Sequence, residues 1–592
     1  MTVNQNIPAL VAPEMAGTHW VRVGMANPIR WFWRLHAHSL LLLTLISIST
    51  VQAQPVVNTG GVLNAASYAI TGLQNSDIAQ GSMFVVFGQR LGPAALQQAQ
   101  SFPLPTQLAG TSIRVTGGGV SADAIMIYTS AGQVAAILPS RIPPGEATIT
   151  LTYNNQPSAP VRMRVRRSSL GIFTRNQAGS GPGIVQNYVS ATDQPVNALT
   201  EVARPGQVMI LWGTGLGPVD FDESRPPEVR SLDVDLDVLV AGKSARVLYK
   251  GRSPQFPGID QINFEIPADT PEGCHVPLAL RAGGVVSNFA TISVASSGRV
   301  CSDGIGPSAA DMEKLRSTGQ LRTGGLVLSK TTVKDLNGVL DELGASFDRY
   351  DHETALKART VGNQVMEYSR PPLPLGTCIV GSGRAGASDL SIAEGSPRPE
   401  RLDPGALLNW QGPRGLKQTQ AGGASVGGGV PGLTGDFGPE YLVPGVYTVD
   451  NGAGSPMVGP FRATLTMPAP LEWTNRESLA VVRRSQDLTV TWNGGDSSKE
   501  YVVVGAASYD TTQEVGAVIT CMERASAGRF TIPSWLLSTL PASGIFPGTS
   551  LPKGNVYLGS SSILEPTRFQ AQGLDVGLFG YQLTSFKFAS VQ

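Results

Sequence analysis

Side chains suited to acid–base or metal chemistry are scarce in this sequence. The chain has five histidines in 592 residues: His19, His36, His38, His275 and His352. The first three belong to a predicted export signal, so a Ser-His-Asp triad or a Cys-His pair would have to use His275 or His352. His275 directly follows Cys274 in a predicted strand, and His352 lies in a charged segment that we expect to be solvated. Structural roles are therefore predicted for both, and zinc sites with two or three histidines are nearly excluded.

Paired carboxylates could still hydrolyse a glycosidic bond without histidine. The densest acidic set is Asp233, Asp235 and Asp237. A calcium loop starting at Asp233 would need Gly and Glu at its sixth and twelfth positions, where Val238 and Ser244 stand. The alternation instead predicts the wet face of an edge strand. No GxSxG elbow, HExxH, or GxGxxG in a β-α setting occurs, so no catalytic residue, metal ligand, cofactor-binding residue or cofactor is predicted.

Two other groups of residues have a structural and a functional interpretation. Arginines alternate along one predicted strand and end at a domain boundary: Arg162, Arg164, Arg166 and Arg167. A solvated face is favoured for them, with contact to an anionic surface polymer as the alternative. The second group is the five tryptophans that lie beyond the predicted signal: Trp212, Trp410, Trp473, Trp492 and Trp535. Core packing is favoured for these, with stacking on sugar rings as the alternative.

All four cysteines lie beyond the predicted signal. They are Cys274, Cys301, Cys378 and Cys521, and none forms a CxxC pair. Four cysteines allow three pairings. We prefer Cys274–Cys301 and Cys378–Cys521, because each pair falls within one predicted domain; buried free thiols are the alternative.

Composition excludes several classes of protein. Glycine (69) and proline (43) are frequent, charged residues make up only 15%, and Lys+Arg and Asp+Glu are both 44. A chain without basic excess has little with which to neutralise nucleic-acid phosphates. Frequent turn residues with few charges favour short strands over long helices. The length predicts three or four domains.

The N-terminal segment has the order of a secretory signal. Arg30 and Arg34 precede the apolar run 40–48, and small residues end at Ala53. The run is too short to cross a bilayer. Met25 is a more natural start than Met1. Cleavage after Ala53 would remove three arginines and one glutamate, leaving a net charge of −2.

The region after the signal contains a repeat. GSMFVVFGQRLGP at 81–93 matches GQVMILWGTGLGP at 206–218, and QVAAILPSRIPPG at 133–145 matches QINFEIPADTPEG at 261–273. Two matches in one order predict duplicated sandwich domains. The first copy is expected to have strands at 83–87, 111–116, 124–128, 133–138, 147–153 and 161–165. The second is expected to have them at 208–212, 232–241, 245–249, 261–266, 276–281 and 285–294. Ala282-Gly283-Gly284 is predicted as a hairpin turn.

These repeats resemble two known families. Pro205-Gly206 with the following strand resembles the opening of IPT/TIG-type immunoglobulin-like domains. Residues 58–303 resemble a family of uncharacterised secreted proteins abundant in Acidobacteria, the Solibacter-type extracellular C-terminal domain. That resemblance rests on four segments: Asn64-Ala65-Ala66-Ser67-Tyr68, Gly81-Ser82 with Phe87-Gly88, Gln261-Ile262-Asn263-Phe264 with Pro267, and Val286-Ser287-Asn288. It implies an extracellular pair of β-sandwiches and no defined activity.

The second half has a mixed pattern. Ser308 and Asp311 predict a capped helix at 308–315. Spacing also suggests a helix at 333–343, between strands at 326–328 and 345–350. A glycine-rich stretch at 422–432 is expected to be a mobile loop, and no GKS or GKT follows it, so a P-loop is excluded. Further strands are expected at 447–449, 461–467, 488–492, 501–505, 517–521 and 530–532, with a helical turn or two at 534–540.

The sequence thus predicts an all-β protein of tandem immunoglobulin-like β-sandwiches, a short helical linker and a C-terminal β-sandwich-like domain. The expected segments are a signal (1–53), sandwich 1 (54–167), sandwich 2 (168–303), a linker (304–325) and a C-terminal β domain (326–592). We expect a secreted, periplasmic or cell-surface protein without enzymatic activity that binds protein or polysaccharide and not nucleic acid. The alternative is an extracellular polysaccharide hydrolase, or its carbohydrate-binding accessory, that uses paired carboxylates.

Overall fold

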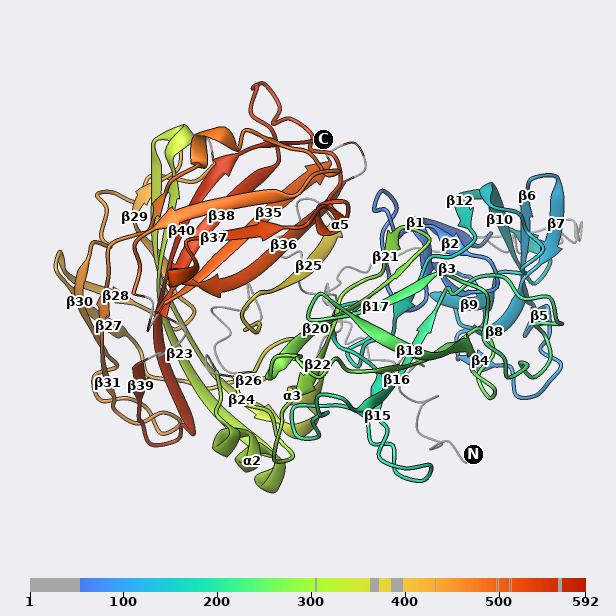
Figure 1. Ribbon diagram of the computed structural model, residues 1–592, viewed down its shortest axis with the longest axis horizontal. Coiled ribbons are helices and arrows are strands. Elements are labelled where there is room, and N and C mark those ends of the chain that lie inside the picture. The colour runs from blue at the N-terminus through green and yellow to red at the C-terminus, as the bar shows by residue number, and fades with distance from the viewer. Residues whose placement is uncertain are drawn as a thin grey trace, which may run out of the picture.

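The computed structural model describes residues 54–303, 306–361, 372–384, 398–431, 433–496, 498, 500–510, 512, 514–562 and 567–592. The predicted signal lies outside these residues. Figure 1 shows two lobes, with the elements from β1 (Val56–Asn64) to β22 (Ala290–Val294) in blue to green on the right. The elements from β23 (Gln320–Val333) onward make up the lobe on the left. Strands dominate both lobes and helices are few and short, which confirms the all-β class.

The first sandwich consists of two sheets that face each other across an apolar core, and their strands pair antiparallel except for the short parallel pair of β2 with β12. One sheet has the order β1, β3 (Met83–Gln89), β9 (Gln133–Ile137), β8 (Ile125–Thr129) and β4 (Gln97–Gln98). The other has the order β2 (Ile78–Ala79), β12 (Val161–Arg166), β10 (Gly145–Tyr153), β6 (Thr111–Gly117) and β5 (Gln107–Leu108), with β7 (Val120–Asp123) and β11 (Gln156–Pro157) at its margins. Side chains alternate between core and solvent along these strands, as Ile113 and Val115 of β6 do.

The second sandwich is one ten-stranded sheet folded around its own core. Its order is β13 (Gly171–Ile172), β16 (Val208–Thr214), β19 (Asp260–Glu265), β18 (Lys243–Arg252), β17 (Leu236–Val240), β20 (Gly273–Ala282), β22 and β14 (Gly181–Pro182), with β15 (Val185–Asn187) on β16 and β21 (Val285–Val286) on β20. β18 pairs with β19 along one part and with β17 along another, so it joins the two faces. Gly283 and Gly284 form the predicted hairpin turn, since Ala282 pairs with Val285.

The sequence repeat corresponds to a repeated strand pair. The first matched segments become β3 and β16, and the second become β9 and β19. β3 pairs antiparallel with β9, and β16 pairs antiparallel with β19. The same two segments are therefore neighbours in both copies, as a duplication predicts.

A buried interface holds the two sandwiches together. Apolar side chains of the first, such as Leu63 and Val85, share a cluster with Ile210 and Trp212 of the second. Beside it, the buried Arg252 pairs with Asp260 and donates to the carbonyl oxygens of Gly81 (2.9 Å) and Gly217 (2.6 Å). Because a buried charge is costly unless fully paired, these contacts fix how the sandwiches are joined.

A capped helix leads into the second lobe. α2 (Ala309–Thr318) begins at Ser308, whose hydroxyl accepts from the Asp311 N–H, while the Asp311 carboxylate accepts from the Ser308 N–H. This is the predicted helix with its predicted cap. Its buried residues Met312 and Leu315 pack in a cluster with Cys274 and Cys301 of the second sandwich.

The C-terminal lobe is built on one long ten-stranded sheet. The order is β25 (Thr377–Arg384), β36 (Val515–Arg524), β35 (Tyr501–Asp510), β38 (Asn555–Ser561), β40 (Val576–Phe588), β23, β24 (Gly338–Asp351) and β26 (Glu400–Arg401), with β29 (Ala424–Gly429) on β24 and β39 (Thr567–Phe569) on β40. β23 and β40 run parallel, from Thr323 beside Val576 to Val333 beside Phe586. The other strand pairs of this sheet among the described residues are antiparallel.

Two smaller layers cover this sheet at different places. The four-stranded layer has the order β28 (Gly415–Thr419), β27 (Leu408–Gly412), β30 (Gly445–Asp450) and β31 (Arg462–Met467). The three-stranded layer has the order β32 (Glu472–Trp473), β34 (Leu488–Asn493) and β37 (Arg529–Ile532), and β33 (Val481–Val482) pairs separately with β41 (Ser590–Val591). The short helices of this lobe are α3 (His352–Lys357), α5 (Ser534–Leu537), η1 (Lys334–Leu336), η2 (Arg476–Ser478) and η3 (Ala525–Ala527). α5 lies within the predicted segment 534–540.

The helix predicted at 333–343 is wrong. Residues 334–336 form the single 3₁₀ turn η1, Asn337 adopts φ +49°, and Gly338 opens β24. β23 and β24 then pair along their whole lengths, from Gln320 beside Asp351 to Val333 beside Gly338. The apolar spacing fits a helix locally, but the long ladder and burial against the four-stranded layer favour strands.

The glycine-rich loop predicted at 422–432 is also wrong in part, because Ala424–Gly429 form β29 against β24. Gly428 has φ +72°, and a Cβ there would lie 1.9 Å from the Val339 carbonyl oxygen. Glycine is needed at this position because the backbone of β29 approaches β24 too closely for a side chain.

Candidate functional site

Both preferred disulfides are present. Cys274 is bonded to Cys301, and Cys378 to Cys521. The second bond joins two residues that stand directly opposite each other on β25 and β36. β25 ends the order of the ten-stranded sheet, so this bond ties an edge strand to its one neighbour.

The two histidines beyond the signal have structural surroundings. His275 is buried, its Nε2 lies 3.7 Å from Oδ2 of Asp303, and burial lowers its pKa to about 4. Burial raises the pKa of Asp303 to about 7, although its Oδ1 accepts a 2.7 Å hydrogen bond from the Cys274 N–H. His352 opens α3, with Nε2 3.4 Å from the Thr200 hydroxyl oxygen. Neither histidine has the neighbours of a catalytic triad in these contacts.

The strand predicted at 232–241 is shorter in the structure, and only Asp237 of the acidic set lies in it, on β17. The prediction of an edge strand is wrong, because β17 pairs with β18 on one side and with β20 on the other. Asp233 and Asp235 are exposed, and Asp237 pairs with Arg281 at 2.7 Å. Leu232 and Val234 between them pack against the core of the second sandwich. Within the described part of the chain, no three His, Cys, Asp or Glu side chains are grouped as metal ligands would be.

The tryptophans pack in cores. Trp212, Trp410, Trp473 and Trp492 are buried. The indole N–H of Trp212 donates to Gln186, and that of Trp492 donates to the Ala525 carbonyl oxygen. Trp535 of α5 is half-buried and stacks on Phe289 of the second sandwich, with ring centroids 6.4 Å apart. The alternative of exposed stacking surfaces is therefore wrong for these five residues.

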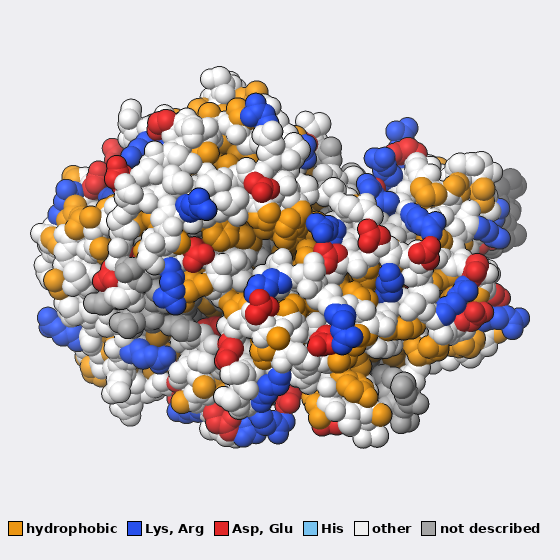
Figure 2. All heavy atoms as spheres, in the orientation of Figure 1, with side chains coloured by type: hydrophobic (Ala, Val, Ile, Leu, Met, Phe, Trp, Pro, Cys, Tyr) orange, Lys and Arg blue, Asp and Glu red, His pale blue; other side chains and the backbone are white. Residues whose placement is uncertain are grey.

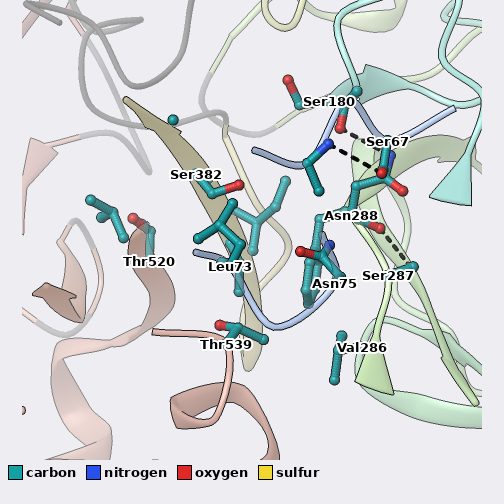
Figure 3. Close-up of a pocket in the computed structure, with 18 of the residues that line it drawn as sticks. Ser67, Leu73, Asn75, Ser180, Val286, Ser287, Asn288, Ser382, Thr520 and Thr539 are labelled. Atoms are coloured by element: carbon teal, nitrogen blue, oxygen red, sulfur yellow. Dashed lines mark hydrogen bonds between the residues drawn. The ribbon is translucent and has the colours of Figure 1, made fainter. Parts of the chain in front are cut away.

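A cavity of about 430 Å³ lies where the two sandwiches meet the C-terminal lobe. We call it the junction cavity. The first sandwich contributes residues 67–75, the second contributes 178–181 and 286–289, and the C-terminal lobe contributes β25 with parts of β35, β36 and β38. Figure 3 shows Ser382 of β25 on one side, Leu73 and Asn75 in the middle, and Asn288 with Ser180 on the far side. Segments from three parts of the chain thus converge on one space.

Two asparagines position the loops at this cavity. Asn64 ends β1, and its Oδ1 accepts from the N–H groups of Ala66 and Ser67, while its Nδ2 donates to the carbonyl oxygens of Ser169 and Thr214. These bonds turn the chain so that Ser67 and Tyr68 line the cavity. The side chain is also nearly saturated with partners, which suits its burial.

Asn288 positions a loop of the second sandwich at the cavity through similar hydrogen bonds. Its Oδ1 accepts from the Ile172 N–H at 2.8 Å, and its Nδ2 donates to the carbonyl oxygens of Ile172 and Gly179 at 2.9 Å. Gly179 has φ +68°, and a Cβ there would lie 2.0 Å from the Ser67 carbonyl oxygen. The loops of the two sandwiches therefore meet backbone to backbone at the cavity wall.

The lining is nearly uncharged and combines aliphatic side chains, such as Leu73, Ile379 and Val518, with hydroxyls, amides and aromatic rings. Hydroxyl and amide side chains that line the cavity are Ser67, Gln74, Asn75, Ser180, Ser287, Asn288, Thr291, Thr360, Ser382, Thr520, Thr539 and Asn555. Tyr68, Phe289, Tyr509, Tyr557 and Phe586 add rings. Burial raises the pKa of Tyr68 and of Tyr509, so their hydroxyls stay neutral. The Asn555 Oδ1 is buried without a hydrogen-bond partner among the described residues.

Charge is almost absent from this lining. Among the described residues that form it, Arg359 is the only charged one, and its Nη2 donates to the Ser180 hydroxyl. The lining contains no Asp, Glu, Lys or His in that part of the chain. A two-carboxylate hydrolysis therefore has no acid and no base there. The space is suited to a ligand that exchanges neutral hydrogen bonds and packs against rings.

The sequence analysis singled out two segments that line the cavity, but it did not predict that they form a cavity wall. Ser67 and Tyr68 belong to the NAASY segment, and Ser287 and Asn288 to the VSN segment, on which the family resemblance rests. The wall formed by β25 was missed. The signal that could have indicated it is Cys378, because a disulfide on an edge strand fixes the place of that strand.

Three of the four arginines that the sequence grouped lie at a different recess, and Arg167 is not part of its lining. Arg162, Arg164 and Arg166 share one face of β12, with Met163 and Val165 turned to the core between them. They line a space between the first sandwich and the C-terminal lobe. Figure 2 shows basic and acidic side chains interspersed over one face of the molecule, as the zero formal charge leads one to expect.

Comparisons with known proteins add little. No protein-family model and no curated protein matches the chain. Domains 5–6 of the S-layer protein SbsC are similar over 41% of this chain and 100% of theirs, with 13% identity and a TM-score of 0.15. Immunoglobulin domains 1–4 of Sidekick-1 are similar over 87% of this chain and 96% of theirs, at 9% identity and a TM-score of 0.11.

The extracellular region of plexin A4 is similar over 40% of this chain, which spans only 18% of that protein, at 10% identity and a TM-score of 0.16. Superpositions this slight carry no argument about function. The resemblance to the acidobacterial family finds no support in these comparisons and stays a prediction.

Proposed function

We propose that the chain is an exported, non-enzymatic binding module whose junction cavity holds a segment of polysaccharide. The observation that carries the proposal is the lining of this cavity, which combines hydroxyls and amides with aliphatic side chains and aromatic rings and, among the described residues, a single charged one. Sugar rings offer many neutral hydroxyls and apolar faces, and such a lining complements both.

The size of the cavity supports a glycan over a protein partner. A space of about 430 Å³ falls within the range of small-molecule sites. A stable protein–protein interface instead needs about 800 Å² from each partner, presented on a broad surface. A few sugar residues of a polymer fit a concave site of this kind, and the rest of the polymer would continue outside it.

Location outside the cytoplasm is part of the proposal. Two disulfides are typical of secreted and periplasmic proteins. The N-terminal segment carries the order of an export signal. Among the described residues, no helix has the length and apolar character needed to cross a membrane. We also keep the domain boundaries at 54–167, 168–303 and 326–592 as a proposal.

The proposal can be tested by filling the cavity. Gly381 of β25 lines it, and a Cβ at Gly381 would meet no atom within 4 Å. We expect residues 54–592 to bind a neutral glycan on an array, and Gly381→Leu to weaken that binding by about tenfold or more because it occupies space the sugar needs. Isothermal calorimetry with the glycan selected on the array measures the change.

Gly132→Leu is the matched control, because Gly132 also has open space and lies in the exposed turn before β9. We expect it to leave binding unchanged. Equal binding by Gly381→Leu and the parent protein would contradict the proposal, as would a parent protein that binds no glycan. Hydrolysis of a bound polysaccharide would instead support the hydrolase alternative.

A further inference from the structure

A second recess adjoins the junction cavity. It has a volume of about 510 Å³ and is formed by β12 and residues 71–78 of the first sandwich together with Arg484, Ser538, Leu540 and Pro541 of the C-terminal lobe. Leu73 and Gln74 line both spaces, so the two lie on either side of one turn. We call the second space the arginine recess. A long ligand that leaves the junction cavity past this turn would enter it.

The strand β12 concentrates positive charge in this recess. Arg162, Arg164 and Arg166 line it from one strand face, and successive side chains on one face lie roughly 6.6 Å apart. Arg484 lines it from the C-terminal lobe. Two parts of the chain thus direct guanidinium groups to one space.

The carboxylates of the recess do not balance these arginines. Asp77 lies 2.9 Å from Arg166 and 4.0 Å from Arg164, and Glu146 stands opposite Arg164 in the ladder of β10 and β12. Within the described residues that line the recess, four arginines therefore face two carboxylates. The surplus is two positive charges on a protein whose formal net charge is zero.

Two of these guanidinium groups have donors to spare. No ion pair is found for Arg162 within the described part of the chain, and its side chain is exposed. Arg484 donates from Nη1 to the Leu540 carbonyl oxygen at 3.1 Å, while its Nε is buried without a hydrogen-bond partner among the described residues. A guanidinium group binds a carboxylate through two parallel hydrogen bonds, so such donors are suited to an acidic ligand.

We propose that the arginine recess binds the carboxylate groups of an acidic polysaccharide whose neighbouring neutral residues occupy the junction cavity. This inference rests on the proposed function, and it names the ligand class as a polymer of uronic acids or of mixed neutral and uronic sugars. The contrast between the two spaces carries it, since one lining is almost uncharged and the adjoining one is arginine-rich. Binding depends on salt, because the charges that attract the polymer lie partly in solvent.

The test uses residues 54–592 with polygalacturonate as the acidic probe and the array-selected glycan as the neutral one. We expect the double variant Arg162→Ala/Arg164→Ala to weaken polygalacturonate binding by about tenfold or more at low salt, and to flatten its dependence on salt. Binding of the neutral glycan should be unchanged. Both replaced side chains are exposed, so the variant is expected to keep the melting temperature of the parent protein.

Arg462→Ala is the matched control. Arg462 is an exposed arginine of β31, in the layer at the far left of Figure 1, and its loss removes one charge away from the recess. It should leave polygalacturonate binding as it is. Equal binding by the double variant and the parent, or parent binding that does not weaken with salt, would overturn the inference. Binding to phosphatidylglycerol vesicles and not to polygalacturonate would overturn it in favour of a lipid ligand.

Failure of this inference can be told apart from failure of the proposed function. If Gly381→Leu abolishes binding of the neutral glycan while the arginine variant binds polygalacturonate as the parent does, the proposed glycan site in the junction cavity is supported. The proposed carboxylate site in the arginine recess is then overturned. If the arginine variant loses polygalacturonate while Gly381→Leu binds as the parent does, the recess acts alone and the cavity proposal falls. A parent protein that binds neither probe overturns both.

Discussion

At the scale of single residues, the amide side chains of Asn64 and Asn288 organise the site more than charged side chains do. Asn64 joins strand β1 to carbonyl groups 105 and 150 residues further along the chain. Asn288 bonds in a similar way to Ile172 at the other end of the second sandwich's sequence. The sequence directed attention to both residues through the resemblance. Their roles could not be predicted, because each hydrogen-bond partner lies far away in the chain.

The buried pair His275 and Asp303 makes stability depend on pH. An unfolded aspartate ionises near pH 3.9, whereas the pKa of Asp303 in the fold is raised to about 7 by burial. Between these values the unfolded chain binds fewer protons than the fold, so this carboxyl makes stability fall as pH rises. His275 acts in the opposite sense, because its pKa falls from 6.5 to about 4 and stability is lost as pH drops through that window.

Asp303→Asn should therefore become more stable relative to the parent protein as pH rises. The amide stays neutral and its oxygen can still accept from the Cys274 N–H. We expect the difference in urea midpoint between variant and parent to shift in favour of the variant from pH 4.5 to pH 7.5. The loss of stability below pH 6.5 should remain in both the variant and the parent protein, since both retain His275. A difference that is constant over this range would show that Asp303 does not titrate as described.

At the scale of elements, the short strands were predictable and the long hairpin was not. Alternation and glycine or proline turns identified strands such as β6 and β10, whose partners are near in sequence. The local spacing of apolar residues in segment 333–343 fits a helix as well as it fits a turn followed by a strand. Whether this segment forms a strand depends on its pairing with β29 and its burial against the four-stranded layer, both formed by residues far along the chain, which local spacing cannot reveal.

The disulfide Cys378–Cys521 holds the β25 wall of the junction cavity. Replacing both cysteines by serine should lower the free energy of unfolding by roughly 2–5 kcal/mol. It should also weaken glycan binding, because β25 would keep only its hydrogen bonds to β36 on one edge. Chemical unfolding and calorimetry measure the two effects.

The pair Cys274→Ser/Cys301→Ser is the control for that variant. These cysteines do not line the junction cavity, yet their bond also closes a loop. Their loss should lower stability and leave glycan affinity unchanged. If both double variants reduce affinity alike, the disulfide of β25 has no special place in the site.

At the scale of the whole molecule, the candidate site exists because three parts of the chain are locked together. Phe289 of the second sandwich stacks on Trp535, and Ala279 and Val286 join the same C-terminal core. The sequence predicted the class of each part and both disulfides. It could not predict the cavity, because the docking of one part on another is decided by complementary surfaces that no local pattern records.

The joint between the sandwiches should be sensitive to a single residue. Arg252→Ala would leave Asp260 buried without its cation and remove the bonds to Gly81 and Gly217. We expect a loss of roughly 3–5 kcal/mol, seen as a lower unfolding midpoint. Arg246→Ala on the same strand removes only an exposed pair with Glu265 and should cost less than about 1 kcal/mol. Similar losses from both would contradict a buried joint.

The parallel pairing of β23 with β40 sets an order of events in the life of the chain. β23 is an interior strand whose second edge is completed by residues 576–586. During synthesis it therefore waits with one open, apolar edge until β40 has been made. The topology of the second lobe thus makes completion of its central sheet wait for the last strands of the chain to be synthesised.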